Sequence, residues 1–219
     1  MNIEKYNKIL NSCNKNNIKL VAVSKTKPKK DILTLYNKNH KVFGENKVQE
    51  LTEKYNSLPK DIEWHFIGHL QKNKVKYLAP FVSLIHAVDS MNLLKEINKR
   101  AINNNRIIKC LIQFHIAKEE SKFGLVESKI EDFFTNISEY KNVEICGVMG
   151  MATFTNDENQ IEKEFESLKI IFDKLKDKYF SNNNSFKEIS MGMSGDYKIA
   201  IEKGSTMLRI GSTIFGSRN

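Results

Sequence analysis

Short apolar runs alternate with amphipathic stretches along the whole chain. Residues 3–14 carry apolar side chains three and four positions apart, which predicts a helix. Eight short runs rich in β-branched and aromatic residues follow, and these predict strands. The predicted strands cover residues 18–25, 42–46, 64–68, 84–88, 109–117, 143–151, 189–191 and 207–210.

Helical periodicity separates most of these strands, and residues 70–74 form a polar connection between two of them. The predicted helices cover residues 29–39, 48–55, 93–102, 130–137, 161–179 and 197–201. No linker rich in Pro, Gly or Ser divides the series. The sequence therefore predicts an α/β protein, a (β/α)8 TIM barrel with an extra N-terminal helix, as one domain over residues 1–219.

An open, doubly wound sheet is the alternative to the barrel. The barrel is favoured because eight βα units are the number that closes it. The residues that could carry chemistry also fall at the carboxyl ends of strands, where barrel sites are built.

The net charge of +9 raises the possibility of a nucleic-acid-binding module. The lysines, however, are spread along the chain among Asp and Glu, and the densest cluster lies at residues 27–30. The aromatic residues occupy positions with the periodicity of a core. We therefore expect a solvated basic surface and no nucleic acid partner.

Three cysteines, Cys13, Cys110 and Cys146, lie far apart and lack the Cys-x-x-Cys spacing. Their number and spacing predict neither a disulfide framework nor a structural zinc site. No segment has the apolar length of a signal peptide core or a membrane span. The sequence predicts a cytoplasmic protein that does not bind membranes.

A lysine ends the first predicted strand. Counting by two along an extended chain, Lys25 shares a face with Val23 and Val21. If that face is the core, loss of water lowers the pKa of the amine and makes it a nucleophile. The alternative is an exposed lysine on an edge strand, as most lysines are solvated.

Loops of small residues follow the seventh and eighth predicted strands, at residues 190–196 and 209–216. Loops at these two positions of a barrel often bind phosphate through backbone N–H groups. Arg209 shares a face with Met207 and Gly211, so it points inward if the Gly211 amide turns toward the phosphate. The alternative is an arginine that caps a strand or pairs with a surface carboxylate. A barrel lysine, a phosphate cradle and an inward arginine together favour pyridoxal phosphate bound as a Schiff base.

Six segments resemble the pyridoxal phosphate homeostasis protein family, the single-domain relatives of the alanine racemase barrel. These segments are residues 22–28, 43–46, 64–74, 119–124, 190–196 and 209–216. The cofactor-binding residues that the resemblance implies are Lys25, Asn46, Ser194, Arg209, Gly211, Ser212 and Thr213. The six segments span almost the whole chain in the family's order.

The resemblance also implies a role for each residue. Lys25 would hold the cofactor as a Schiff base, Asn46 would lie near the ring, and Arg209 would face the pyridine nitrogen. The phosphate would be held by Ser194, the amides of Gly211 and Ser212, and Thr213. His115 departs from the family, in which an asparagine is expected there, so the ring's surroundings on that side are left open.

Arg209 bears on catalysis because a guanidinium only donates hydrogen bonds. It would leave the pyridine nitrogen unprotonated and the ring a weak electron sink. Related racemases take a second acid/base from an added C-terminal domain, and this sequence ends at Asn219.

The resemblance and the missing second acid/base favour a monomeric carrier over an enzyme. This carrier would act in cellular vitamin B6 homeostasis and supply apo-enzymes with the cofactor. A weakly active amino-acid racemase or lyase is the alternative.

Overall fold

The computed structural model describes residues 1–119, 123–135 and 137–217. The strands within these ranges are β1 (Lys19–Val23), β2 (Val42–Glu45), β3 (Glu63–Phe66), β4 (Leu84–Val88), β5 (Ile108–Gln113), β6 (Val143–Met149), β7 (Glu188–Ser190) and β8 (Met207–Ile210). Neighbouring strands are parallel, and β8 pairs with β1. This pairing closes the sheet, so the predicted barrel is confirmed and the open sheet is excluded.

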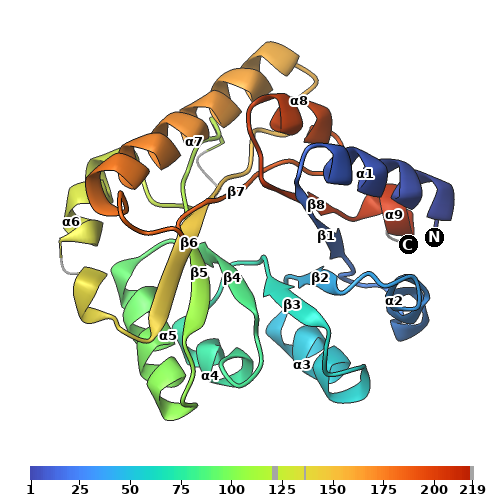
Figure 1. Cartoon of the computed structure of the whole chain (residues 1–219), viewed down its shortest axis with the longest axis horizontal. Coiled ribbons are helices and arrows are strands. Elements are labelled where there is room, and N and C mark those ends of the chain that lie inside the picture. Colours follow the sequence, from blue (N-terminus) through green and yellow to red (C-terminus); the bar gives the residue numbers. More distant parts are fainter. Residues whose placement is uncertain (120–122, 136, 218–219) are drawn as a thin grey trace.

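Helices cover the outside of the barrel (Figure 1). They are α1 (Ile3–Lys15), α2 (Lys29–Tyr36), α3 (Val48–Ser57), α4 (Val75–Leu78), α5 (Met91–Asn103), α6 (Ile130–Phe134), α7 (Glu158–Tyr179), α8 (Tyr197–Glu202) and α9 (Ser212–Phe215). Short 3-10 turns occupy η1 (Lys72–Lys74), η2 (Glu127–Lys129) and η3 (Ile137–Glu139). The extra helix α1 packs beside α9, where the Asn2 amide donates to the Ile214 carbonyl at 2.7 Å.

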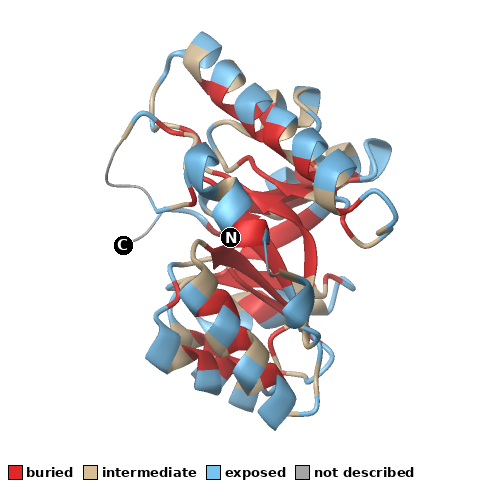
Figure 2. Ribbon diagram, turned by 90° about the vertical axis from the view of Figure 1, so that its left-hand side faces the viewer, coloured by how far each residue is buried: buried red, intermediate tan, exposed pale blue. Residues whose placement is uncertain are grey.

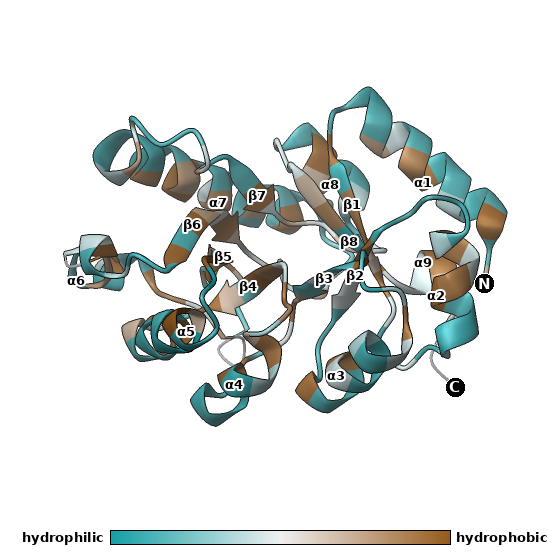
Figure 3. Cartoon of the chain, turned by 60° about the horizontal axis from the view of Figure 1, so that its bottom comes forward, coloured by the Kyte–Doolittle hydropathy of each residue, from teal (hydrophilic) through white to brown (hydrophobic). Residues whose placement is uncertain are grey.

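Side-chain caps start the three longest helices. Asn2, Ser90 and Asp157 each accept a hydrogen bond from the backbone amide three residues on. Such caps satisfy amide groups that have no partner within the helix. The apolar stripes of these helices turn toward the strands and their polar faces turn outward (Figure 3).

The boundaries of several predicted elements were wrong. The first strand ends at Val23, so Lys25 lies beyond it in a β-turn closed by the Lys27 amide and the Ser24 carbonyl at 3.0 Å. The fifth and sixth strands end before their predicted limits, at Gln113 and Met149. The polar connection at 70–74 leads into η1 and α4, which are too short to show a periodic stripe.

Two stretches of the predictions include residues that lie outside the described ranges. The segment 119–124 includes residues 120–122, and the predicted helix 130–137 includes residue 136. Of that helix, the structure describes α6 and then η3.

The apolar core has two parts, and both bury the strands (Figure 2). The larger part lies between the barrel and the helices and includes Phe43, Trp64 and Phe165. The smaller part fills the barrel with residues that include Val21 and Met207. Inner side chains of this kind fill the interior of barrels of eight strands.

Strand β6 has a bulge next to Gly147, where its register with β5 shifts by one residue. Cys110 of β5 pairs with Ile145, but the next residue, Leu111, pairs with Gly147. Gly147 has a φ of +151°, and a Cβ built there would lie 1.8 Å from the Glu188 carbonyl oxygen. The close approach of β7 to β6 therefore requires glycine at this position.

The cysteines do not form disulfides: Cys13, Cys110 and Cys146 are all free and buried. Burial raises the pKa of Cys110 well above its ordinary value. In the described ranges no cluster of three or more His, Cys, Asp or Glu side chains is placed to hold a metal. None of the helices in these ranges is long and apolar enough to cross a membrane.

Candidate functional site

The predicted site residues meet at one end of the barrel. Lys25 follows β1, Asn46 follows β2, and Ser194 follows β7. Arg209 lies within β8, and Gly211 leads from that strand into α9. Because β7, β8, β1 and β2 are consecutive around the barrel, their carboxyl ends form one continuous part of its mouth.

The loops after β7 and β8 touch through Ser194, whose hydroxyl oxygen accepts from the Thr213 amide at 3.3 Å. Gly211 precedes α9 and provides no side-chain cap for it. A Cβ at Gly211 would lie 3.2 Å from the Val23 carbonyl oxygen, so this backbone sits closely against the end of β1. The Ser194 hydroxyl and the backbone amides at the start of α9 are groups of the kind that bind a small anion such as phosphate.

Arg209 is buried inside the barrel. Its Nη1 donates to the Ser190 hydroxyl at 2.7 Å and its Nη2 to the Gly150 carbonyl at 3.0 Å. The neighbours Leu208 and Ile210 belong to the outer core, so the predicted inward direction is confirmed and a surface ion pair is excluded. Burial lowers the pKa of Arg209 to about 10, which leaves it charged at neutral pH.

A chain of buried polar groups continues from Arg209 across the barrel. Ser190 Oγ lies 3.0 Å from His86 Nδ1, and His86 Nε2 lies 3.0 Å from His65 Nδ1. Arg209 can only donate, so the Ser190 hydroxyl accepts from it. The proton of this hydroxyl is then available to donate to His86 Nδ1. His86 then donates from Nε2 to His65. We call these four residues the histidine chain.

Both histidines of this chain are neutral. Burial, with a smaller contribution from the charge of Lys19, lowers the pKa of His65 to about 3. Burial also lowers the pKa of His86 well below its ordinary value, and the nearby His65 and Arg209 add to this effect. Arg209 is therefore the charged member of the chain at neutral pH.

Acid is expected to destabilise the protein through these histidines. Below about pH 6.5 the unfolded chain binds protons at His65 and His86 that the folded protein does not. Each such histidine lowers the free energy of unfolding by up to ~1.4 kcal/mol per pH unit, down to its folded pKa. Urea unfolding between pH 7 and 5 measures this slope.

His65→Gln removes one of these protonation sites and should flatten the slope. His69→Gln removes an exposed histidine outside the barrel, whose Nδ1 lies 3.2 Å from Asp89 Oδ2; this variant is the control and should not flatten the slope. An unaltered slope in His65→Gln would show that buried neutral His65 does not set the acid sensitivity.

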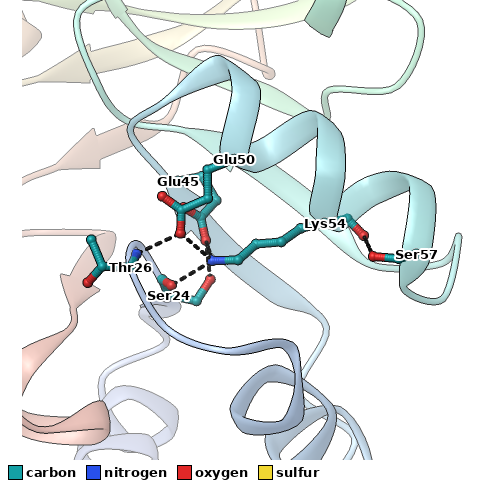
Figure 4. A network of polar contacts seen from close by, with 6 residues as sticks. All are labelled: Ser24, Thr26, Glu45, Glu50, Lys54 and Ser57. Carbon is teal, nitrogen blue, oxygen red and sulfur yellow. Dashed lines mark hydrogen bonds and ion pairs between the residues drawn. The ribbon is translucent and has the colours of Figure 1, made fainter.

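A second polar group lies outside the barrel, beneath the turn that carries Lys25 (Figure 4). Lys54 Nζ donates to Glu45 Oε1, to Glu50 Oε1 and to the Ser24 carbonyl, at 2.7, 2.7 and 2.8 Å. The Ser24 hydroxyl donates to Glu45 Oε1 at 2.6 Å, and the Thr26 amide donates to Glu50 Oε1 at 2.6 Å. We call these five residues the turn cluster.

The electrostatics of the turn cluster are dominated by burial. The side chain of Glu45 is 0% exposed and that of Lys54 is 6% exposed. Burial raises the pKa of Glu45, although Lys54 and the Ser24 hydroxyl oppose the shift. The second carboxylate oxygen of Glu45 is buried and has no hydrogen-bond partner among the residues that the structure describes. Lys54 is therefore the cation that compensates this carboxylate.

The histidine chain and most of the turn cluster were not predicted from the sequence. A signal was present for each. His65 lies between Trp64 and Phe66, so strand alternation turns it to the inner face. Lys54 lies between Leu51 of α3 and Leu58, the residue that caps this helix, on its buried face, where a solvated lysine is not expected.

His115 lies just after β5 and is half-buried. Its Nε2 is 2.9 Å from the Glu119 carbonyl oxygen. This contact orients the ring within its own loop.

The fold and the site define a class: a closed (β/α)8 barrel whose mouth combines a lysine, a buried arginine and a loop pair suited to an anion. The family model for the alanine racemase N-terminal domain matches residues 2–219. The pyridoxal phosphate homeostasis protein of Aquifex aeolicus is 42% identical over 201 residues, which cover 91% of this chain and 87% of that protein.

Two further relatives agree with this match. The human pyridoxal phosphate homeostasis protein is 39% identical over 212 residues, covering 92% of this chain and 77% of that protein. The structure of PipY from Synechococcus elongatus with PLP bound has 30% sequence identity and a TM-score of 0.83, covering 91% of this chain and 93% of that one. The chain belongs to the pyridoxal phosphate homeostasis protein family.

Proposed function

We propose that the chain binds pyridoxal 5'-phosphate through Lys25 and serves in the homeostasis and supply of this cofactor in the cell. The observation that carries the proposal is the meeting of three features at adjacent strand ends. Lys25 follows β1, Arg209 lies in β8, and Ser194 contacts Thr213 where the loops after β7 and β8 meet. The PLP-bound PipY structure and the names of the relatives support it.

The residues of the mouth fit the parts of this ligand. The cofactor supplies an aldehyde that condenses with a neutral amine to form a C=N bond, releasing the carbonyl oxygen as water. Lys25 is the amine in this proposal. Ser194, the amides of Gly211 and Ser212, and Thr213 would hold the phosphate, and Asn46 would lie beside the ring.

Arg209 supports a carrier more than a catalyst. Its guanidinium is held by Ser190 and Gly150, and the neutral histidines behind Ser190 offer no carboxylate to the pyridine nitrogen. An arginine there donates to an unprotonated nitrogen and leaves the ring a weak electron sink. We therefore propose that residues 1–219 form one binding domain that stores and delivers the cofactor to apo-enzymes.

The test of binding is covalent capture. Pyridoxal phosphate added to the cofactor-free protein should produce a visible absorption band, and borohydride reduction should leave the adduct on the peptide that contains Lys25. Lys25→Ala should lose most of the band, because its amine forms the C=N bond. Lys27→Ala is the matched control; its amine donates to the Ser217 carbonyl at 2.8 Å, and it should keep the band.

Two outcomes would contradict the proposal. An unchanged band in Lys25→Ala would assign the attachment to another lysine. Exchange of amino-acid α-protons by the wild-type protein, lost in Lys25→Ala, would support an enzyme instead of a carrier.

A further inference from the structure

We propose that the turn cluster positions Lys25 and Asn46 for the ligand, with Glu50 and Glu45 as its positioning residues. This inference rests on the proposed function, because it concerns the two residues assigned to the aldehyde and the ring. The cluster itself lies outside the barrel, between β2 and α3, and its polar atoms act through the backbone.

The cluster holds the Lys25 turn on both sides of that residue. On the near side, the Ser24 carbonyl accepts from Lys54 and the Ser24 hydroxyl donates to Glu45. On the far side, the Thr26 amide donates to Glu50. Residues 24 and 26 are therefore both fixed to the layer outside the barrel, which fixes the backbone from which the Lys25 side chain leaves.

The turn needs such support because of its backbone. Thr26 has a φ of +65°, a conformation that costs a β-branched residue energy. Glycine or asparagine would adopt it more readily at this place in a turn. The hydrogen bond from Thr26 to Glu50 therefore stabilises a strained residue directly after Lys25.

The same cluster reaches Asn46 through β2. Glu45 is the last residue of that strand, and its side chain turns outward to Lys54. Asn46 is the next residue along the chain, so the anchored Glu45 also fixes the position of the Asn46 backbone. Glu45 Oε1 accepts from both Ser24 and Lys54, which ties the ends of β1 and β2 to one atom.

Lys54 has no donor left for a ligand. An ammonium group has three donors, and here all three are used by Ser24, Glu45 and Glu50. Its effect on Lys25 is therefore indirect. Glu50 is the best residue to change, because its side chain is 21% exposed and Lys54 keeps two partners without it.

The experiment compares Glu50→Ala with Glu53→Ala. Glu53 lies on the same helix α3, is exposed and carries the same charge, so the two changes match in helix propensity and net charge. We expect Glu50→Ala to slow the attachment of pyridoxal phosphate to Lys25 by about tenfold, because a reacting group that is held less well in position reacts more slowly. Glu53→Ala should react at the wild-type rate.

A second readout needs no cofactor. The cofactor-free proteins are labelled with limiting acetic anhydride across a range of pH, and mass spectrometry gives the reactivity of Lys25 relative to Lys27. Glu50→Ala should change the Lys25 profile while the protein stays folded by circular dichroism. Glu50→Gln keeps an acceptor for the Thr26 amide and should restore much of the wild-type profile.

The failures of the two proposals are distinguishable. If pyridoxal phosphate does not attach to Lys25 of the wild-type protein, the proposed function fails, and the labelling profile still tests the positioning. If Glu50→Ala and Glu53→Ala behave alike in both readouts, the positioning inference is overturned. A fall in melting temperature with an unchanged Lys25 profile would likewise overturn it, because it shows a structural role alone.

Discussion

Gly147→Ala is expected to prevent the chain from folding into a stable barrel. The new Cβ would lie 1.8 Å from the Glu188 carbonyl oxygen, and φ at this residue is +151°. Either β7 must move away from β6 or the bulge must be lost. We expect the free energy of unfolding to fall by at least about 4 kcal/mol, a size that single substitutions reach only when they severely disrupt the core.

Gly195→Ala provides the matched control for this prediction. A Cβ at Gly195 has nothing within 4 Å, so this change should leave the urea unfolding midpoint near the wild-type value. A Gly147→Ala protein with a wild-type unfolding midpoint would show that β6 and β7 approach each other less closely.

Lys54→Met is expected to lower the free energy of unfolding by about 3–5 kcal/mol, the cost of breaking a buried ion pair on one side. Without the ammonium group, the Glu45 carboxylate keeps only the Ser24 hydroxyl among its donors. The Ser24 carbonyl also loses a donor. Denaturant unfolding of the cofactor-free protein measures the loss.

Two further variants make this prediction specific. Lys95→Met, at an exposed lysine of α5, should change the free energy of unfolding by less than about 0.5 kcal/mol. The double variant Glu45→Met with Lys54→Met removes both charges and should recover most of the loss, because apolar replacement of a whole buried pair is often neutral. A double variant as unstable as Lys54→Met would show that lost packing, and not an uncompensated charge, causes the effect.

The fold could be predicted from the sequence because the strands and helices repeat with regular periods. The run from Leu84 to Val88 and the run from Met207 to Ile210 gave strands with the observed limits. The predicted limits were wrong where an element is too short to show a period, or at the end of a strand. The 3-10 turn η1 and the four-residue helix α4 are examples, and so is the end of β1 at Val23.

Strand alternation placed Arg209 on one face with Met207 and Gly211, and the loop that begins at Gly211 indicated that this face is the inner one. The partners of Arg209 were not predictable, since Ser190, His86 and His65 come from three other strands and meet only once the barrel closes. The turn cluster was missed for the same reason, since Lys54 comes from α3 and Ser24 lies 30 residues earlier. Contacts of this kind depend on the packing of elements, which local patterns do not encode.

The position of α3 on the barrel is also determined by the turn cluster. A helix packed by apolar contacts alone can slide by one turn, about 5.4 Å, and still bury a similar stripe. Such a slide would move Lys54 away from Glu45. The Glu45 side chain is 0% exposed, so water could not replace the lost ion pair. The buried charges therefore select a single register for α3 among the packings that its apolar residues would allow.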